Sequence, residues 1–253
     1  DSGDDPDITN KAKICAEVKF LDKKDIIIKG GKGVGIVTKP GLAVGVGEYA
    51  INPTPRKMIL KELTDFLPKD KGFEVTISVP GGKALADKTF NPRLGVVGGI
   101  SIIGTTGIVE PRSLDAYKTS LALQLDVLKA SGLARAVFVL GYVGEKFCKD
   151  VLKIQDDAII KIADHAGFML EQCARKGIKE VVLAGHIGKL IKIANGQFNT
   201  HFQFGDGRME SIANFARLSG ASGKINEKIL EQKTAEATVG ILKENELMEV
   251  CNL

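Results

Sequence analysis

Two short runs of apolar residues, at 135–140 and 180–184, constrain the fold of this chain more than any other feature. Each run follows a segment whose apolar residues recur at helical spacing, at 114–130 and at 157–176. Strands of a parallel sheet read as continuous apolar runs, because helices cover both of its faces. The second half of the chain is therefore predicted to form a three-layer α/β domain with a parallel-type sheet.

Helix boundaries in this half follow from capping residues. Ser113 is placed to cap the 114–130 helix, and Gly132 is placed to end it. Beyond Asn226 the tail is expected to form two short helices. The strand at 135–140 begins soon after the first helix ends, as a βα unit requires.

The first half reads instead as strands interrupted by glycine and proline. The expected elements are strands at 13–21, 25–29 and 74–79, a helix opened by Pro55, and a glycine-broken strand-like run at 95–109. The chain is therefore divided into a mixed α+β domain at 1–112 and an α/β domain at 113–253.

Composition excludes several classes of protein. The 253 residues are 44% hydrophobic, contain no Trp, and carry 35 Lys and Arg against 31 Asp and Glu, a net charge of +4. A disordered chain and a dedicated nucleic-acid binder are excluded on these grounds. No apolar run approaches the roughly 20 residues of a membrane span, so no membrane partner is expected. Four scattered cysteines and three histidines predict no protein-held metal and fit the cytoplasm.

Both predicted parallel strands run into glycine-containing loops. The residues concerned are Gly141, Gly144 and Glu145 after the first strand, and Gly185, His186 and Gly188 after the second. Ligands of open α/β sheets bind at the carboxyl ends of the strands, where glycine admits a ligand to the backbone. A carboxylate such as Glu145 could hold ribose hydroxyls. The alternative is that both loops are ordinary strand-to-helix turns.

The glycine-rich segment at 29–35 is typical of a phosphate cradle, although it lacks P-loop spacing. The segment at 45–50 matches G-x-G-x-x-A, but Pro53 and Pro55 follow too soon for the helix that a dinucleotide site requires. A twisted glycine-rich hairpin explains either segment equally well.

A dense polar segment lies at 199–209. It contains Asn199, His201, Asp206 and Arg208, and a His–Asp pair there could move protons. The alternative is a turn followed by a helix that Asp206 caps. Four aspartates also crowd the N-terminus, at Asp1, Asp4, Asp5 and Asp7, where a frayed solvated end is the simplest interpretation.

Taken in order along the chain, these motifs resemble the cobalt-precorrin-5B C1-methyltransferase family of anaerobic cobalamin biosynthesis. The resemblance covers nearly the whole chain and includes the opening aspartate motif. It rests on residues 33–42, 47–56, 91–95, 98–111, 185–189, 198–201 and 206–209. Two features depart from the family. A Thr-Thr-Gly-Thr-Cys-like N-terminal motif is not present, and the usual Pro-Gly-Asn-Tyr-Gly loop reads Leu140-Gly141-Tyr142-Val143-Gly144.

The resemblance implies methyl transfer from S-adenosylmethionine to C1 of a cobalt-bound, ring-contracted tetrapyrrole. It also implies a two-domain α/β protein unlike the usual Rossmann methyltransferases. The cobalt would arrive with the corrinoid substrate. The sequence leaves room for a homodimer without requiring one.

Physical reasoning then assigns residues to this chemistry. The methyl donor is expected on the strand-end loops at Gly141, Gly144, Glu145, Gly185, His186 and Gly188. Candidate general bases are His201, Asp206 and Glu48. The carboxylates of the macrocycle require cations and hydroxyls, expected from Lys39, Arg56, Thr105, Thr106, Arg112, Lys189, Asn199 and Arg208.

Two other functions remain open at this point. A non-catalytic tetrapyrrole carrier would use the same cations without binding the methyl donor. An enzyme of phosphoryl chemistry would use the glycine-rich loops, but would need magnesium-dependent nucleotide binding.

Overall fold

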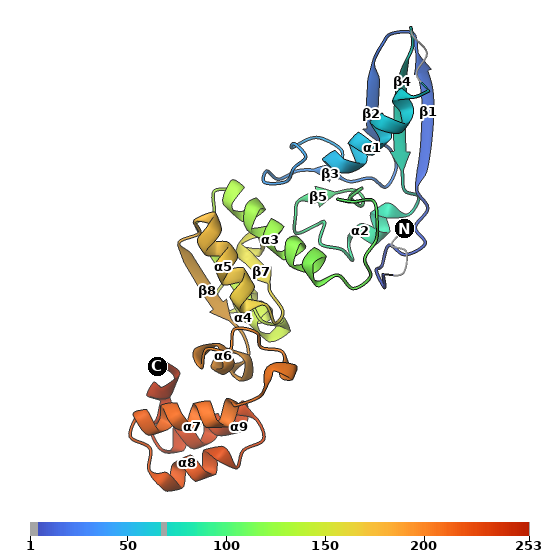
Figure 1. Ribbon diagram of the computed structural model, residues 1–253. Helices are drawn as coiled ribbons and strands as arrows, with labels where there is room; N and C mark the ends of the chain where they lie inside the picture. Colours follow the sequence, from blue (N-terminus) through green and yellow to red (C-terminus); the bar gives the residue numbers. More distant parts are fainter. Residues whose placement is uncertain (1–4, 67–69, 253) are drawn as a thin grey trace. The chain divides into compact units, whose positions relative to one another are not determined.

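The computed structural model describes residues 5–66 and 70–252, so Asp1 and Asp4 lie outside the described residues. The chain divides into two compact units, Asp1–Leu133 and Ala134–Leu253, which Figure 1 shows in sequence colours. The two units are divided after helix α3 (Leu114–Ala130), whereas the sequence predicts a domain boundary before this helix. The domain boundary at 112/113 stays a prediction.

The first unit contains a three-stranded sheet of order β1-β4-β2. Strand β4 (Gly72–Ser78) pairs antiparallel with β1 (Cys15–Leu21) and parallel with β2 (Ile26–Gly30). Alternate residues of β4 are buried, including Val75 and Ile77, and they form one side of the core under helix α1 (Pro53–Thr64). These strands match the expected ranges closely, but the helix begins at Pro53 rather than Pro55.

A second layer of this unit is built from short elements. Strand β3 (Ile36–Val37) pairs antiparallel with β5 (Val96–Val97), and helix α2 (Gly82–Ala86) lies between β4 and β5 in sequence. Of the strand-like run predicted at 95–109, only two residues form a strand, and a few others form isolated β-bridges. Helix α3 packs Val127 against the core around Val37 and Val96.

The N-terminus of α3 confirms the capping prediction. The Ser113 hydroxyl oxygen accepts a hydrogen bond of 3.2 Å from the backbone N–H of Ala116, and the helix ends at Ala130. Asp5, near the start of the chain, is also tied down in this region, because its Oδ1 accepts a 2.9 Å hydrogen bond from the backbone N–H of Arg112.

The second unit holds the predicted parallel sheet, in the order β7-β6-β8. Strands β6 (Arg135–Val139), β7 (Ile159–Lys161) and β8 (Glu180–Ala184) are joined by α4 (Tyr142–Asp150) and α5 (Ala166–Lys176). The chain moves from β6 to one neighbour and then crosses to the other. Right-handed crossovers in opposite directions place the two helices on opposite faces, which gives three layers. The predicted fold class is confirmed.

One element differs from the sequence prediction. The segment predicted as one helix at 157–176 contains a 3-10 turn at Asp156–Ala158 (η1), strand β7, and only then helix α5. The apolar stripe of this segment fits a helix by spacing, yet Ile159 and Ile160 are buried as neighbours in the sheet. Three strand residues are too few for periodicity to distinguish.

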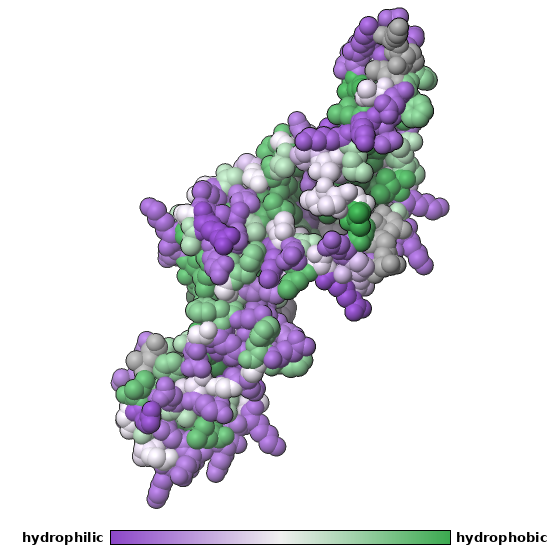
Figure 2. Space-filling model, in the orientation of Figure 1, coloured by the Kyte–Doolittle hydropathy of each residue, from purple (hydrophilic) through white to green (hydrophobic). Residues whose placement is uncertain are grey.

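The chain ends in a small helical layer. It consists of α6 (Ile187–Ala194), α7 (Arg208–Leu218), α8 (Gly223–Leu230) and α9 (Ala235–Glu244), with 3-10 turns at Phe202–Phe204 (η2) and Met248–Asn252 (η3). A core of its own includes Ile212, Ile229 and Leu242. Figure 2 shows hydrophobic residues scattered among hydrophilic ones over α7 to α9, and the homodimer stays a prediction. No helix in the described part of the chain is long and apolar enough to cross a membrane.

Candidate functional site at the carboxyl edge of the parallel sheet

The carboxyl ends of β7 and β8 bring together a carboxylate, an ammonium group and a hydroxyl. Asp164 follows β7, and its Oδ1 accepts hydrogen bonds from Lys189 Nζ and from Thr200 Oγ1, the latter at 2.7 Å. Lys189 lies in the first turn of α6, just after β8. Ala163 precedes Asp164 with φ +48°, in the left-handed region that costs a side chain about 1 kcal/mol or more. This strained turn directs the chain into the polar cluster.

Asp164 is held in its ionised form. Partial burial opposes ionisation, but the hydrogen bonds from Lys189 and Thr200 outweigh it and lower the pKa of the carboxyl from its usual value. Nearby His201 adds a smaller effect in the same direction. Oδ2 of Asp164 accepts no hydrogen bond from the described residues, so one oxygen remains available to a ligand.

His201 and Asn199 flank this cluster. The Asn199 side-chain oxygen accepts a 3.1 Å hydrogen bond from the backbone N–H of His201. Nδ1 of His201 accepts from the backbone N–H of Gln203 at 3.3 Å, and the ring lies 4.5 Å from that of Phe202. Because an accepting ring nitrogen carries no proton, the proton of neutral His201 is on Nε2. His201 is therefore arranged to donate from Nε2.

Asp206 and Arg208 form an ion pair with two hydrogen bonds. Nε of Arg208 donates to Oδ1, and Nη2 donates to Oδ2 at 2.7 Å. The hydrogen bonds from Arg208 hold the pKa of the Asp206 carboxyl below its usual value. The partner of Asp206 is thus Arg208 and not His201. Gly207, with φ +51°, occupies the N-cap of α7, so the alternative in which Asp206 caps this helix is wrong.

The N-terminus of α6 joins the two parts of the site. His186 caps it, with Nδ1 accepting from the Gly188 N–H at 3.1 Å and Nε2 lying 2.5 Å from Oε1 of Glu236. A Cβ on Gly188 would lie 3.4 Å from Nη1 of Arg208, so this guanidinium covers the first turn of α6. His186, Gly188, Lys189 and Arg208, all expected from the sequence, are brought together here.

The loop after β6 has a strong structural explanation. A Cβ on Gly144 would overlap the carbonyl oxygen of Ala184 and lie 3.0 Å from Cα of Gly185. Glu145 is buried and paired with Lys161 and, at 3.5 Å, with Lys149. Gly141 differs, because its φ of +145° demands glycine while a Cβ there would meet nothing within 4 Å.

The first unit holds the other predicted residues, among them Arg56. Arg56 donates to three backbone carbonyls: Nε to Ile51 at 2.8 Å, Nη2 to Tyr49 at 3.4 Å and Nη1 to Ile28 at 3.5 Å. This guanidinium ties the start of α1 to the neighbouring strand and loop. A part for Arg56 in substrate binding stays a prediction.

The remaining predicted residues of this unit lie in loops. Glu48 is exposed, and its carboxylate has no hydrogen-bond or ion-pair partner in the described part of the chain. Lys39 is half-buried with its stem against Gly95. Thr105, Thr106 and Arg112 are exposed, and the Thr106 hydroxyl oxygen accepts from the Ile108 N–H at 3.2 Å.

Sequence reasoning missed two residues of the cluster, Asp164 and Lys192. Asp164 was hidden inside the segment predicted as a single helix. Lys192 is a buried lysine on α6 whose Nζ donates to the carbonyl oxygens of Gly205, at 2.8 Å, and Thr200, at 3.4 Å. Its position on an apolar helix gave no sign that it anchors the loop of His201.

The chain was compared with known proteins. The family profile described as CbiD matches residues 1–111, and that described as CbiD, C-terminal domain, matches residues 199–253. A crystal structure of a cobalamin biosynthesis protein (cbiD) from Archaeoglobus fulgidus is 27% identical, covering 77% of this chain and 60% of that one, with a TM-score of 0.34.

Curated relatives give the fuller match. The cobalt-precorrin-5B C(1)-methyltransferase of Methanobrevibacter smithii is 49% identical over 98% of this chain and 70% of its own length. That of Methanocaldococcus jannaschii is 50% identical over 96% and 68%. The chain thus spans about two thirds of the length of these relatives. At this identity and coverage, the chain belongs to the CbiD family of cobalt-precorrin-5B C(1)-methyltransferases.

Proposed function

We propose that this chain is a methyltransferase that moves a methyl group from S-adenosylmethionine to C1 of cobalt-precorrin-5B in cobalamin biosynthesis. The observation that carries this conclusion is the 49% identity to a curated relative of that name over 98% of the chain. It favours an enzyme over a tetrapyrrole carrier, because the relatives are named for the transfer itself.

We assign the methyl donor to the carboxyl edge of the parallel sheet. The donor carries an ammonium group and ribose hydroxyls, and the accessible Oδ2 of Asp164 fits either of them. Gly141 supports the assignment, because the backbone there is open to a ligand. Gly185, His186 and Gly188 would line the same edge. Gly144 and Glu145 contribute by packing and ion pairing, which holds α4 in place.

The carboxylates of the corrinoid are expected to meet cations and hydrogen-bond donors of this chain. Arg208 and Lys189 are already paired with carboxylates of the protein. A substrate carboxylate would therefore bind to a cation that keeps its protein partner. Nε2 of His201 is a further donor, and Phe202 beside it is 77% exposed, which offers an apolar surface to a flat ring. Lys39, Arg112, Thr105, Thr106 and Asn199 remain in the proposed set.

The chemistry asks little of the protein beyond alignment. Bound S-adenosylmethionine supplies an activated methyl group, and the protein must align it with the ring carbon and exclude water. A general base would need a free, basic group. Asp206 is held ionised by Arg208, and His201 presents its protonated nitrogen, so both are poor bases. Glu48 is the remaining candidate, since its carboxylate is unpaired among the described residues.

Transfer of a labelled methyl group tests this proposal. The protein is incubated with methyl-labelled S-adenosylmethionine and cobalt-precorrin-5B, and label is measured in the macrocycle together with S-adenosylhomocysteine. Glu48→Gln should lower kcat by about 10²-fold or more with little change in KM. Glu62→Gln, on the exposed side of α1, is the matched control. A protein that binds the corrinoid but transfers no label would be a carrier.

A further inference from the structure

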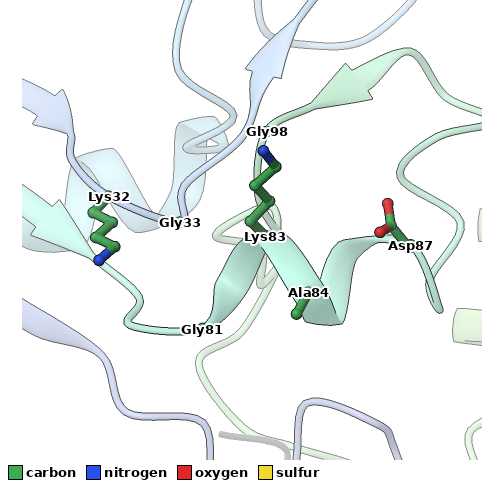
Figure 3. Close-up of a pocket in the computed structure, with 7 residues that line it drawn as sticks. All are labelled: Lys32, Gly33, Gly81, Lys83, Ala84, Asp87 and Gly98. Atoms are coloured by element: carbon green, nitrogen blue, oxygen red, sulfur yellow. The ribbon is translucent and has the colours of Figure 1, made fainter.

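The glycine-rich segment after β2 forms the floor of a hollow in the first unit. The hollow has a volume of about 540 Å³, within the range of small-molecule sites. Figure 3 shows its lining: Lys32, Gly33, Gly81, Lys83, Ala84, Asp87 and Gly98. Nothing in the proposed chemistry above uses these residues.

Three stretches of backbone cross beneath this hollow without side chains between them. A Cβ on Gly33 would overlap the Val79 carbonyl oxygen, and one on Gly82 would overlap the carbonyl oxygen of Gly33. A Cβ on Gly99 would lie 2.6 Å from the carbonyl carbon of Val34. Two backbone hydrogen bonds hold the crossing in place. The Val79 N–H donates to the carbonyl oxygen of Lys32 at 2.8 Å, and the Ile100 N–H donates to the carbonyl oxygen of Gly33 at 3.0 Å. The floor is therefore rigid main chain.

The walls carry uncompensated positive charge. Neither Lys32 nor Lys83 has an ion-pair partner in the described part of the chain. In Figure 3 the side chain of Lys83 extends from α2 toward Gly98, whereas Asp87 stands at the other end of the helix. Two ammonium groups against one carboxylate leave the lining with a net charge of +1. A lining with a surplus of positive charge favours an anionic ligand.

Backbone donors add to this preference. The N–H groups of Gly33, Gly81 and Gly98 donate to no residue that the structure describes. All three glycines have positive φ, at +80°, +86° and +85°, and a Cβ on Gly81 or Gly98 would meet nothing within 4 Å. Three backbone N–H groups at residues that line the hollow are thus left for solvent or a ligand.

We infer that this hollow binds carboxylate side arms of the tetrapyrrole substrate, with Lys32 and Lys83 as the charged contacts. The identity of the ligand rests on the proposed function, because that substrate carries acetate and propionate groups. The lysines pair with the carboxylates while the glycine floor admits the side arm close to the main chain. The site would select substrates by the position of their side arms.

Binding of uroporphyrin I, an octacarboxylate porphyrin, tests the inference directly by its absorbance change on titration. Lys32→Ala and Lys83→Ala should each raise Kd about tenfold, and the double variant about a hundredfold, as expected for loss of charge-assisted hydrogen bonds. Ala84→Leu fills the hollow from the exposed face of α2 and should also weaken binding. Lys88→Ala removes the same charge beyond the hollow and should leave Kd within twofold.

Three results would overturn the inference. The double variant could bind uroporphyrin as the wild type does. Lys88→Ala could weaken binding as much as Lys83→Ala, which would indicate a general charge effect. Inorganic phosphate could displace uroporphyrin at constant ionic strength while ATP binds more tightly, which would make this a phosphate site.

Methyl transfer by the same variants separates this inference from the proposed function. If the wild type transfers no methyl group yet the uroporphyrin losses occur, the proposed function fails and the carboxylate site stands. If the double variant transfers methyl with an unchanged KM for cobalt-precorrin-5B, the carboxylate site fails and the proposed function stands.

Discussion

Gly144 and Ala184 touch through their backbones, where the first turn of α4 meets the last residue of β8. A Cβ on Gly144 would overlap the Ala184 carbonyl oxygen and lie 2.8 Å from its carbon. This contact holds the loop after β6 against the loop after β8. The two strand-end loops of the candidate site are thus positioned by a pair of residues that need no ligand.

Gly144→Ala is expected to lower the free energy of unfolding by about 1–3 kcal/mol, because the added methyl group must displace backbone. Gly240→Ala is the matched control, since Gly240 lies within α9 and a Cβ there meets nothing within 4 Å. It should raise stability by about 0.5–1 kcal/mol through helix propensity. Urea unfolding of both variants measures the difference, and equal effects would contradict the structure.

Asp164 should make stability depend on acid pH. Its pKa is lowered in the folded protein, so its contribution is fully present above the unfolded value and is lost as pH falls through the folded value. Asp164→Asn should therefore cost about 1–2 kcal/mol at pH 7 and flatten the loss of stability below about pH 4. Thermal unfolding between pH 2 and 7 tests this, with exposed Asp150→Asn as the control.

The two buried cysteines should react with thiol reagents much more slowly than the two exposed cysteines. Cys148 and Cys173 are buried, and burial raises the pKa of the Cys173 thiol to about 11. Cys15 and Cys251 are exposed. A thiol reagent at pH 8 should label the exposed pair within minutes and the buried pair only after unfolding. Rapid labelling of Cys173 in the native protein would contradict its placement.

Ser113→Ala should destabilise the protein by about 1 kcal/mol, because the N–H of Ala116 loses its acceptor at the start of α3. Ser120, on the same helix, bonds back to the carbonyl of Ala116 at 3.0 Å and makes no cap. Ser120→Ala should be neutral or slightly stabilising, and denaturant midpoints compare the two variants.

Much of the fold is readable from the sequence, where local signals agree with tertiary packing. Ser113 marks the start of α3 within one residue, and β8 occupies the predicted range 180–184. Strand β7 was not predicted from the sequence, because its three residues lie within a stretch whose apolar residues recur at helical spacing. Only pairing with β6 makes them a strand, and that contact is invisible to a local pattern.

For the candidate site too, local features could be predicted from the sequence, but contacts between distant residues could not. Glycines at strand ends could be recognised, but not that Gly144 serves packing while Gly141 is open. Asp164 was not predicted as a site residue, because it follows β7 within the segment that was predicted as a single helix. The tautomer of His201 depends on a hydrogen bond from Gln203, and the partner of Asp206 depends on the turn at Gly207. Such relationships arise from backbone geometry, which residue types alone do not encode.

The crossing of Gly33, Gly82 and Gly99 has a consequence for how this protein can diversify. A floor made of main chain offers no side chain to exchange, so its shape is closed to gradual substitution. Only the rim, at Lys32, Lys83, Ala84 and Asp87, can vary without a collision. Homologues that handle differently decorated macrocycles would therefore be expected to differ at the rim and to share the glycines beneath it.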